Sequence, residues 1–265
     1  MQRPKHLPEF RSPPLDEVVL GVQFAPVSGY STIHAGQVWE LFRNEFPIVQ
    51  EQSPLAPAFE TFGLPQVGTI SFGFSPTPPH MRYWFVSQSN EHLIQFQNDR
   101  LLHNWRKVGD RTNDYPRFEA VLEKFRTELS ILEKYFSFFK AGALCITQCE
   151  LSYVNKIQVI SGGKPQNLLR FLPPNGIDFD DFNIVSRRAL IEDNGSPWGR
   201  LICEASSTID THGQAGVALS LTTRGAPKTP DIRGALDFLG RGREVICTSF
   251  AAVTTDSAHQ KWERV

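Results

Sequence analysis

The sequence has no excess of charge of either sign, few cysteines and no long apolar run. Its 265 residues include 27 Lys and Arg against 28 Asp and Glu, a formal net charge of −1. The net charge of the whole chain therefore does not favour binding to nucleic acid or to an anionic membrane. The apolar runs fall far short of the ~20 residues that cross a bilayer. Residues 1–14 are polar and contain prolines, without the apolar core of a signal peptide.

Cysteine is also scarce, with four residues in the chain. Four are too few for a disulfide framework, and all of them lie in apolar stretches where a free cysteine behaves as a small hydrophobe. These observations predict a cytoplasmic protein.

Motifs for catalysis, metals and cofactors are missing as well. No glycine-rich loop opens a helix after a strand, and the seven histidines lack metal-ligand spacing. The loop at 161–165 is followed by proline and is better explained as a connection than as a phosphate loop. The acidic run 178–181 is better explained as a solvated turn than as a cation site. We therefore expect no cofactor, no metal and no catalytic residue.

The composition that remains is that of an ordinary globular protein, with 40% hydrophobic and 21% charged residues. We expect one domain over residues 1–265. Residues 50–80 are predicted as loop with one short strand around 68–74. Hydrophobic periodicity predicts strands at 17–24, 82–88, 92–97, 100–106, 143–159, 183–192, 200–210 and 217–223, and helices at 34–46, 115–139, 166–172, 230–252 and 256–262.

The same order of predicted strands and helices occurs twice along the chain. The sequence predicts an α+β fold in which two pseudo-equivalent β-α-β-β-β-α halves, residues 14–140 and 141–265, form one antiparallel sheet. The long helices are expected to pack on one face of it. Folds of the TATA-binding-protein type and helix-grip folds share this arrangement, which is an analogy of shape and not of function.

The clearest local prediction is a β-hairpin. Asn98-Asp99 forms a two-residue turn, which places Phe96 opposite Leu101 and Ile94 opposite His103. His103 then lies on the buried face, where a satisfied core histidine is a better interpretation than a catalytic one. The alternate residues form the other face, which we expect to be mostly solvated.

That second face supplies the candidate binding surface. Planar guanidinium and amide groups form paired hydrogen bonds, which favours recognition of a partner, although a plain solvated face explains them too. Arg117 joins the set because a cation at a helix start is unfavourable unless it is paired or binds something. Glu150 could pair with Glu204 if their strands are neighbours. The candidate residues are Gln95, Gln97, Arg100, Asn104, Arg106, Lys107, Arg117 and Glu150.

Several strings match a known family. They are Pro13-Pro14-Leu15 with Glu17-Val18-Val19, Gln97 to Arg100, Asn104 to Lys107, Tyr115-Pro116-Arg117, Cys149 to Asn155 and Ala235 to Phe238, with Phe250 and Trp262. Together they resemble a sporadically distributed prokaryotic family with no assigned activity. The resemblance implies horizontal transfer and a role in genome conflict, such as phage defence or a toxin–antitoxin system. It brings no cofactor or catalytic residue.

Three functions follow as hypotheses. The first is a non-enzymatic binding or accessory module that engages a partner protein or a second copy of itself through the polar sheet face. The second is a nucleic-acid-binding protein that uses the same basic residues. The third is an enzyme of unknown class, which requires carboxylates and His or Arg to converge in a deep pocket.

Overall fold

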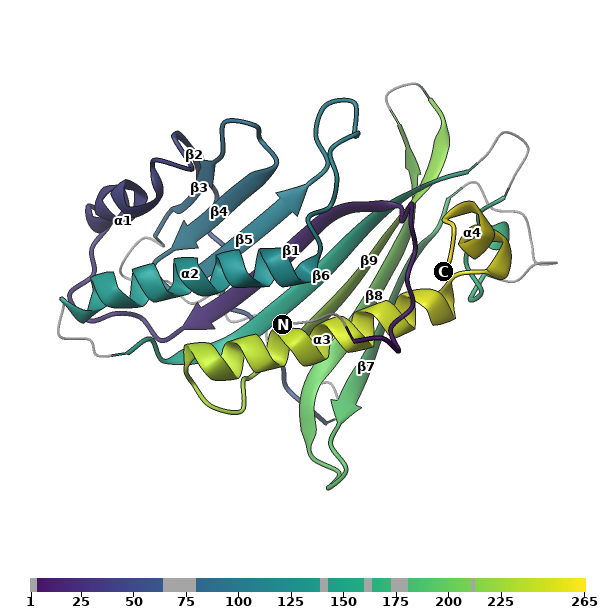
Figure 1. Cartoon of the computed structure of the whole chain (residues 1–265). Helices are drawn as coiled ribbons and strands as arrows, with labels where there is room; N and C mark the ends of the chain where they lie inside the picture. The colour runs from purple at the N-terminus through teal and green to yellow at the C-terminus, as the bar shows by residue number, and fades with distance from the viewer. Residues whose placement is uncertain (1–3, 64–79, 139–142, 160–163, 173–180, 211–212) are drawn as a thin grey trace.

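Nine strands form one antiparallel sheet within residues 4–63, 80–138, 143–159, 164–172, 181–210 and 213–265, which the computed structural model describes (Figure 1). The protein therefore has an α+β fold, as the sequence predicts. Across the sheet the strands follow the order β2-β3-β4-β5-β1-β6-β9-β8-β7. The strands are β1 (Leu15–Phe24), β2 (Ile48–Gln52), β3 (Arg82–Val86), β4 (His92–Gln97), β5 (Arg100–Arg106), β6 (Ile146–Gln158), β7 (Asn183–Ile191), β8 (Pro197–Ile209) and β9 (Ala215–Gly225).

The two central strands come from distant parts of the sequence. β1 pairs with β6, with Leu20 opposite Leu151, and its other edge pairs with β5. On the β4–β5 hairpin, Phe96 pairs with Leu101 and Ile94 with His103, which confirms the predicted register.

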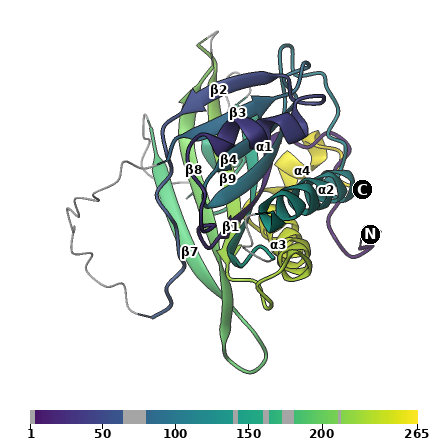
Figure 2. The same ribbon diagram turned by 90° about the vertical axis from the view of Figure 1, so that its left-hand side faces the viewer.

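The long helices α2 (Phe118–Ser137) and α3 (Ile232–Val253) lie side by side on one face of the sheet (Figures 1 and 2). A shorter helix, α1 (His34–Phe42), lies beside α2, and α4 (Asp256–Lys261) follows α3. No helix among the described residues combines the length and apolar character that a membrane crossing requires.

The core fills the layer between the sheet and these helices. Alternate residues of β1, among them Val18, Leu20 and Val22, are almost fully buried there. The apolar stripe of α2, which includes Phe125 and Phe136, covers them. Burial of each such side chain contributes about 1.5–3 kcal/mol, so this layer supplies most of the stability of the fold.

Several predictions of local structure need correction. β2 lies where the sequence predicts loop, because a five-residue edge strand with three exposed residues leaves no hydrophobic alternation. α2 begins at Phe118, so Tyr115 and Pro116 precede it. The helix predicted at 166–172 is a short 3₁₀ turn, Pro165–Asn167. The predicted strand at 68–74, the loop at 161–163 and most of the acidic run at 178–181 lie outside the described residues.

Candidate functional site

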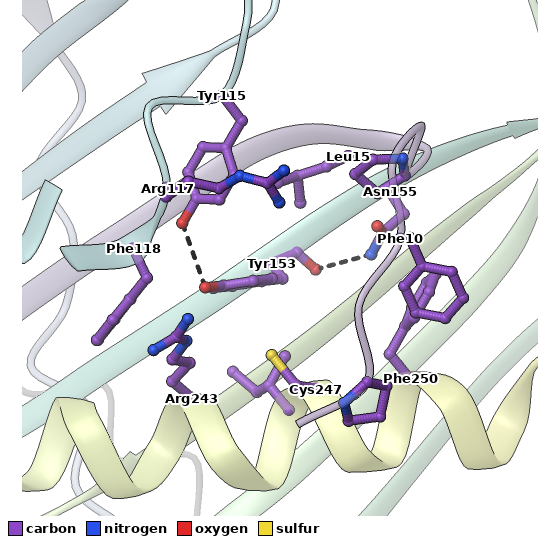
Figure 3. Close-up of a pocket in the computed structure, with 13 residues that line it drawn as sticks. Phe10, Leu15, Tyr115, Arg117, Phe118, Tyr153, Asn155, Arg243, Cys247 and Phe250 are labelled. Carbon is purple, nitrogen blue, oxygen red and sulfur yellow. Dashed lines mark hydrogen bonds between the residues drawn. The ribbon is translucent and has the colours of Figure 1, made fainter. Parts of the chain in front are cut away.

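The eight predicted side chains lie in two places. Lys107 and Arg117 lie beside the start of α2 on the helix side of the sheet, where Arg117 lines a pocket shown in Figure 3. We call this the helix-face pocket. The polar sheet face, on the opposite side, comprises Gln23, Gln95, Gln97, Arg100, Asn104, Arg106, Glu150, Arg200 and Arg224.

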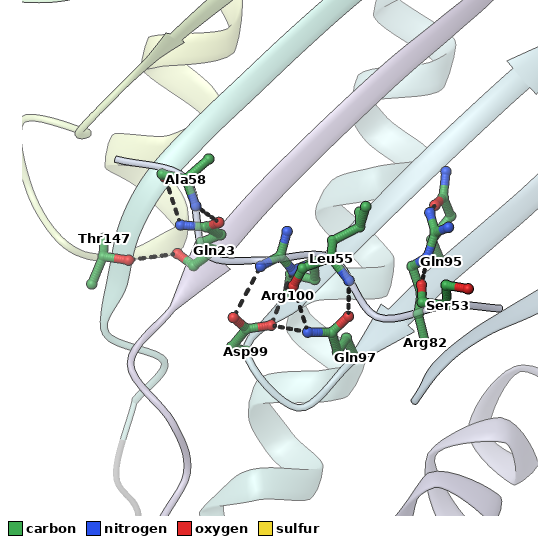
Figure 4. A network of polar contacts seen from close by, with 10 residues as sticks. All are labelled: Gln23, Ser53, Leu55, Ala58, Arg82, Gln95, Gln97, Asp99, Arg100 and Thr147. Atoms are coloured by element: carbon green, nitrogen blue, oxygen red, sulfur yellow. Dashed lines mark hydrogen bonds and ion pairs between the residues drawn. The ribbon is translucent and has the colours of Figure 1, made fainter. Parts of the chain in front are cut away.

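The prediction that this face is mostly solvated is wrong for its centre. Gln95, Gln97, Arg100 and Asn104 are between 3% and 7% exposed. The physical reason is a long-range contact that periodicity does not encode. Residues 53–62, which form neither helix nor strand, cross the face and cover it (Figure 4). We call this segment the strap.

Two glutamines hold the backbone of the strap. Gln97 accepts a hydrogen bond from the Leu55 amide at 2.9 Å and donates one to the Leu55 carbonyl at 3.0 Å (Figure 4). Gln23 holds Ala58 in the same way, at 2.8 and 2.9 Å. Arg82 adds a bond to the Ser53 carbonyl at 3.2 Å. Because each glutamine uses both groups of its amide, the side chains pair with the strap as a neighbouring β-strand would.

The far end of the strap is held by charge. Arg200 donates to the Glu60 carboxylate and to the Thr61 carbonyl, both at 2.6 Å. Arg224 lies between two carboxylates, 2.6 Å from Glu150 and 3.4 Å from Glu60. The strap therefore crosses from β4 over β1 to β9 and β8.

The remaining polar groups under the strap form two sets of hydrogen bonds. Arg100 makes a two-pronged ion pair with Asp99, with both distances 3.0 Å. Gln95 donates to Asn104 at 2.9 Å, and Asn104 donates to Glu17 at 2.7 Å. Gln97 also donates to Asp99 at 3.2 Å, and this bond holds the glutamine that binds Leu55 in one orientation.

One buried acceptor under the strap stays unpaired. A cavity between the strap and the sheet is lined by Gln23, Leu55, Arg100 and Gln148, among others. The Gln148 Oε1 atom is buried and has no hydrogen-bond partner among the described residues. An unpaired buried acceptor costs about 1–3 kcal/mol. The strap therefore does not satisfy every polar group of the surface that it covers.

One further prediction is settled by strand order. Glu150 and Glu204 do not form a carboxylate pair, because β9 lies between β6 and β8 and places Arg224 opposite Glu150. Arg106 lies at the end of β5 and donates to the Asn90 carbonyl at 2.8 Å.

The helix-face pocket brings together residues that are noticeable in the sequence only one at a time. Arg117, Tyr115, Tyr153 and Asn155 line it, and the Tyr115 and Tyr153 hydroxyl oxygens are 3.3 Å apart (Figure 3). Burial raises the pKa of both phenols, so they stay protonated over the physiological range. Their convergence requires the β1–β6 register and the packing of α3, which no local pattern encodes.

A histidine pair with a carboxylate is a further cluster. His103, fully buried, lies 2.9 Å from Glu128 through Nδ1 and 3.0 Å from His92 through Nε2. The interpretation as a satisfied core histidine agrees with these contacts. His92 and Glu128 were not predicted, because the sequence does not show which residue of α2 lies over β5. Burial, and then the neighbouring His103, lowers the pKa of His92 to about 4.

Within the described ranges, no three His, Cys, Asp or Glu side chains lie close enough to hold a metal ion. Comparisons of the chain with models of known families, with curated proteins and with solved structures give no match. The case for a function therefore rests on the two sites themselves.

Proposed function

We propose that the chain is a non-enzymatic binding module that holds an extended segment of a partner protein on its polar sheet face. The strap occupies this face in the free chain. The observation that carries the proposal is the paired hydrogen bonding of Gln97 with Leu55 and of Gln23 with Ala58. Side-chain amides that hydrogen-bond to backbone groups can bind segments of many different sequences. Recognition by strand addition likewise depends on hydrogen bonds to the backbone of the bound segment.

The spacing of the two contacts indicates the conformation of the partner. Leu55 and Ala58 are three residues apart, and a proline precedes each of them. Three residues are one turn of a polyproline II helix, which returns the same backbone edge to the same side. Beyond them, Arg200 and Arg224 hold a carboxylate. The proposed partner segment is therefore extended, contains proline and carries an acidic residue two positions after the second contact.

The strap buries little apolar surface in this position. Phe59 is 60% exposed, Phe62 38% and Leu55 37%. Hydrogen bonds and ion pairs hold it, and each neutral bond contributes a net of about 0.5–1.5 kcal/mol. Such a segment opens at low free energy, which supports exchange with a partner.

The test replaces residues 53–62 with an equally long Gly/Ser segment and adds a synthetic peptide of residues 52–62. We expect the peptide to bind the strap-replaced chain and not the native chain. A peptide with glutamine in place of Glu60 should bind about tenfold weaker, because it loses the charge-assisted bonds.

The matched control carries Gln23→Ala and Gln97→Ala in the strap-replaced background and should lose the peptide. Thermal unfolding of each variant checks that the sheet is intact. If the folded strap-replaced chain does not bind the peptide, the polar sheet face is only a structural support for the strap and the proposal is wrong.

The nucleic-acid alternative has less support on this face. Arg100, Arg200 and Arg224 each form an ion pair with a carboxylate, so the face has little uncompensated positive charge for phosphates. We also propose that the partner is a protein of a genome-conflict system, such as phage defence or a toxin–antitoxin system.

We also infer that the two halves, residues 14–140 and 141–265, are pseudo-equivalent and form a saddle. In support, β5, β4 and β3 lie in order outward from β1, and β9, β8 and β7 lie outward from β6. Each series leads into a long helix. β2 has no counterpart among the described residues of the second half.

A further inference from the structure

The helix-face pocket lies away from the strap, on the other side of the sheet. Five parts of the chain meet there: the segment before β1, the first residue of β1, the start of α2, β6 and α3 (Figure 3). Its apolar wall is formed by Phe10, Leu15, Ile246 and Phe250. The rings of Phe10 and Phe250 meet edge to face, with their centroids 5.5 Å apart. This wall offers an apolar body a place to bind.

A buried arginine forms another part of the pocket. Arg243 is 5% exposed and lines the pocket from α3. Its Nη1 donates to Glu119 at 2.7 Å, and its guanidinium lies 4.9 Å from the centre of the Phe118 ring. A guanidinium has five N–H donors, and the described residues supply one hydrogen-bond acceptor to this one. Most of its N–H groups therefore have no acceptor among the residues that the structure describes.

Arg117 adds a second cation to the pocket. Its side chain makes no hydrogen bond or ion pair with any described residue, so of the two explanations for its position, pairing and binding, pairing has no support among them. Its backbone has φ 73° and ψ 154°, a conformation that costs about 1–3 kcal/mol in a residue other than glycine. It precedes α2, whose first N–H groups have no side-chain cap and carry partial positive charge.

The two tyrosines add a further donor. Tyr115 and Tyr153 share one hydroxyl–hydroxyl contact, which uses one of their two protons. The second proton has no acceptor among the described residues. Counted together, the polar side chains that line the pocket offer several donors, and the described lining residues include no carboxylate. Glu119, the partner of Arg243, lies outside this lining. A ligand that completes this set must bring acceptors and negative charge.

We propose that the helix-face pocket binds a small organic anion, with a carboxylate or phosphate head group on an apolar or aromatic body. The head group lies between Arg117, Arg243 and the tyrosine hydroxyls, and the body lies against Phe10 and Phe250. The site is separate from the polar sheet face, so either proposal can fail without the other. Nearby, Lys107 and Arg11 add positive charge beside Arg117 and favour the approach of an anion.

The experiment measures binding of 3-phenylpropanoate, phenyl phosphate and the neutral 3-phenylpropan-1-ol to the full chain by calorimetry. We expect at least one anion to bind at least tenfold more tightly than the alcohol, because the alcohol lacks the charge-assisted bonds. The preferred anion identifies the head group. Arg117→Gln should weaken the anion about tenfold and leave the alcohol unchanged, and Tyr153→Phe should weaken the anion about threefold.

Cys247 reports the location independently, since its thiol lines the pocket. The bound anion should slow alkylation of Cys247 by iodoacetamide, as read by mass spectrometry. Cys145, which is exposed elsewhere, is the internal control and should be unaffected. Equal binding of acid and alcohol, no anion binding below about 10 mM, or unprotected Cys247 would each overturn the proposal.

Discussion

Arg200 and Glu60 form an ion pair across 140 positions of the sequence, with Nε and Oε2 2.6 Å apart. Their side chains are 18% and 11% exposed, so the pair is largely shielded from solvent. It fastens the strap, which belongs to the first half of the chain, to a strand of the second half. The position of the strap therefore depends on both halves of the sheet.

Replacing Glu60 with glutamine should loosen the strap without unfolding the sheet. The change removes the negative charge that Arg200 and Arg224 face, and a hydrogen bond to a charged group contributes about 1.5–3 kcal/mol. Hydrogen exchange at the amides of Leu55 and Ala58 should become faster, while amides of β1 keep their protection. Glu192→Gln is the control, because its pair with Arg241 is exposed and should alter neither exchange nor stability noticeably. Unchanged exchange at Leu55 would show that the ion pair does not hold the strap.

Acid should destabilise the protein through His92. The unfolded chain takes up a proton near the ordinary pKa of 6.5, while the folded chain takes it up only near pH 4. The contribution of this group to stability is complete above pH 6.5 and is lost as the pH falls towards 4. His92→Gln should flatten the free energy of unfolding, measured in urea, over this interval. An equally steep pH dependence in the variant would rule His92 out as its cause.

The contact of α3 with β9 leaves no room for a side chain at Gly242. A Cβ atom there would lie 2.3 Å from the Thr223 Oγ1 atom, and Thr223 is fully buried. Gly242→Ala should lower the free energy of unfolding by about 1–3 kcal/mol. Gly240→Ala is the matched control in the same helix, with nothing within 4 Å of the added atom, and should raise it by about 0.5–1 kcal/mol. Equal effects in urea would contradict the close contact.

Arg117→Gly should stabilise the protein while it removes a cation from the helix-face pocket. Glycine adopts a positive φ without strain, so the free energy of unfolding should rise by about 1 kcal/mol. Arg117→Ala keeps the strain and should bring no such gain. A loss of stability in the glycine variant would show that the arginine side chain stabilises the fold by itself.

The sequence predicts those parts of the fold that depend on local patterns. Asn98-Asp99 fixes the β4–β5 register because a two-residue turn leaves no other pairing, and the apolar stripe of α2 reports its buried face. The strap has no hydrophobic periodicity, and Thr61 is its one β-branched residue, so nothing in residues 53–62 shows that it covers a sheet. The sequence therefore predicts that Gln97 and Arg100 belong to a polar surface, but it does not predict that this surface is buried.

The helix-face pocket could be predicted only in fragments. Arg117 is a cation at the start of a helix, where positive charge is unfavourable, and Asn155 is a polar residue on the strand face that the sequence predicts to be buried. Each is therefore noticeable from the sequence by itself. Their proximity depends on the pairing of β1 with β6 and on the position of α3. Neither can be deduced from one sequence, since each joins segments that are far apart in the chain.

The long reach of the strap also has a consequence during synthesis. Residues 53–62 leave the ribosome well before Arg200 and Arg224, which hold the far end of the strap. At ordinary rates of translation the interval is roughly ten to thirty seconds. During that time Gln23 and Gln97 exist without a complete cover. The strap itself is made before Gln97, but its far end lacks the two arginines until they emerge. A partner that binds the polar sheet face would therefore displace the strap most easily during synthesis.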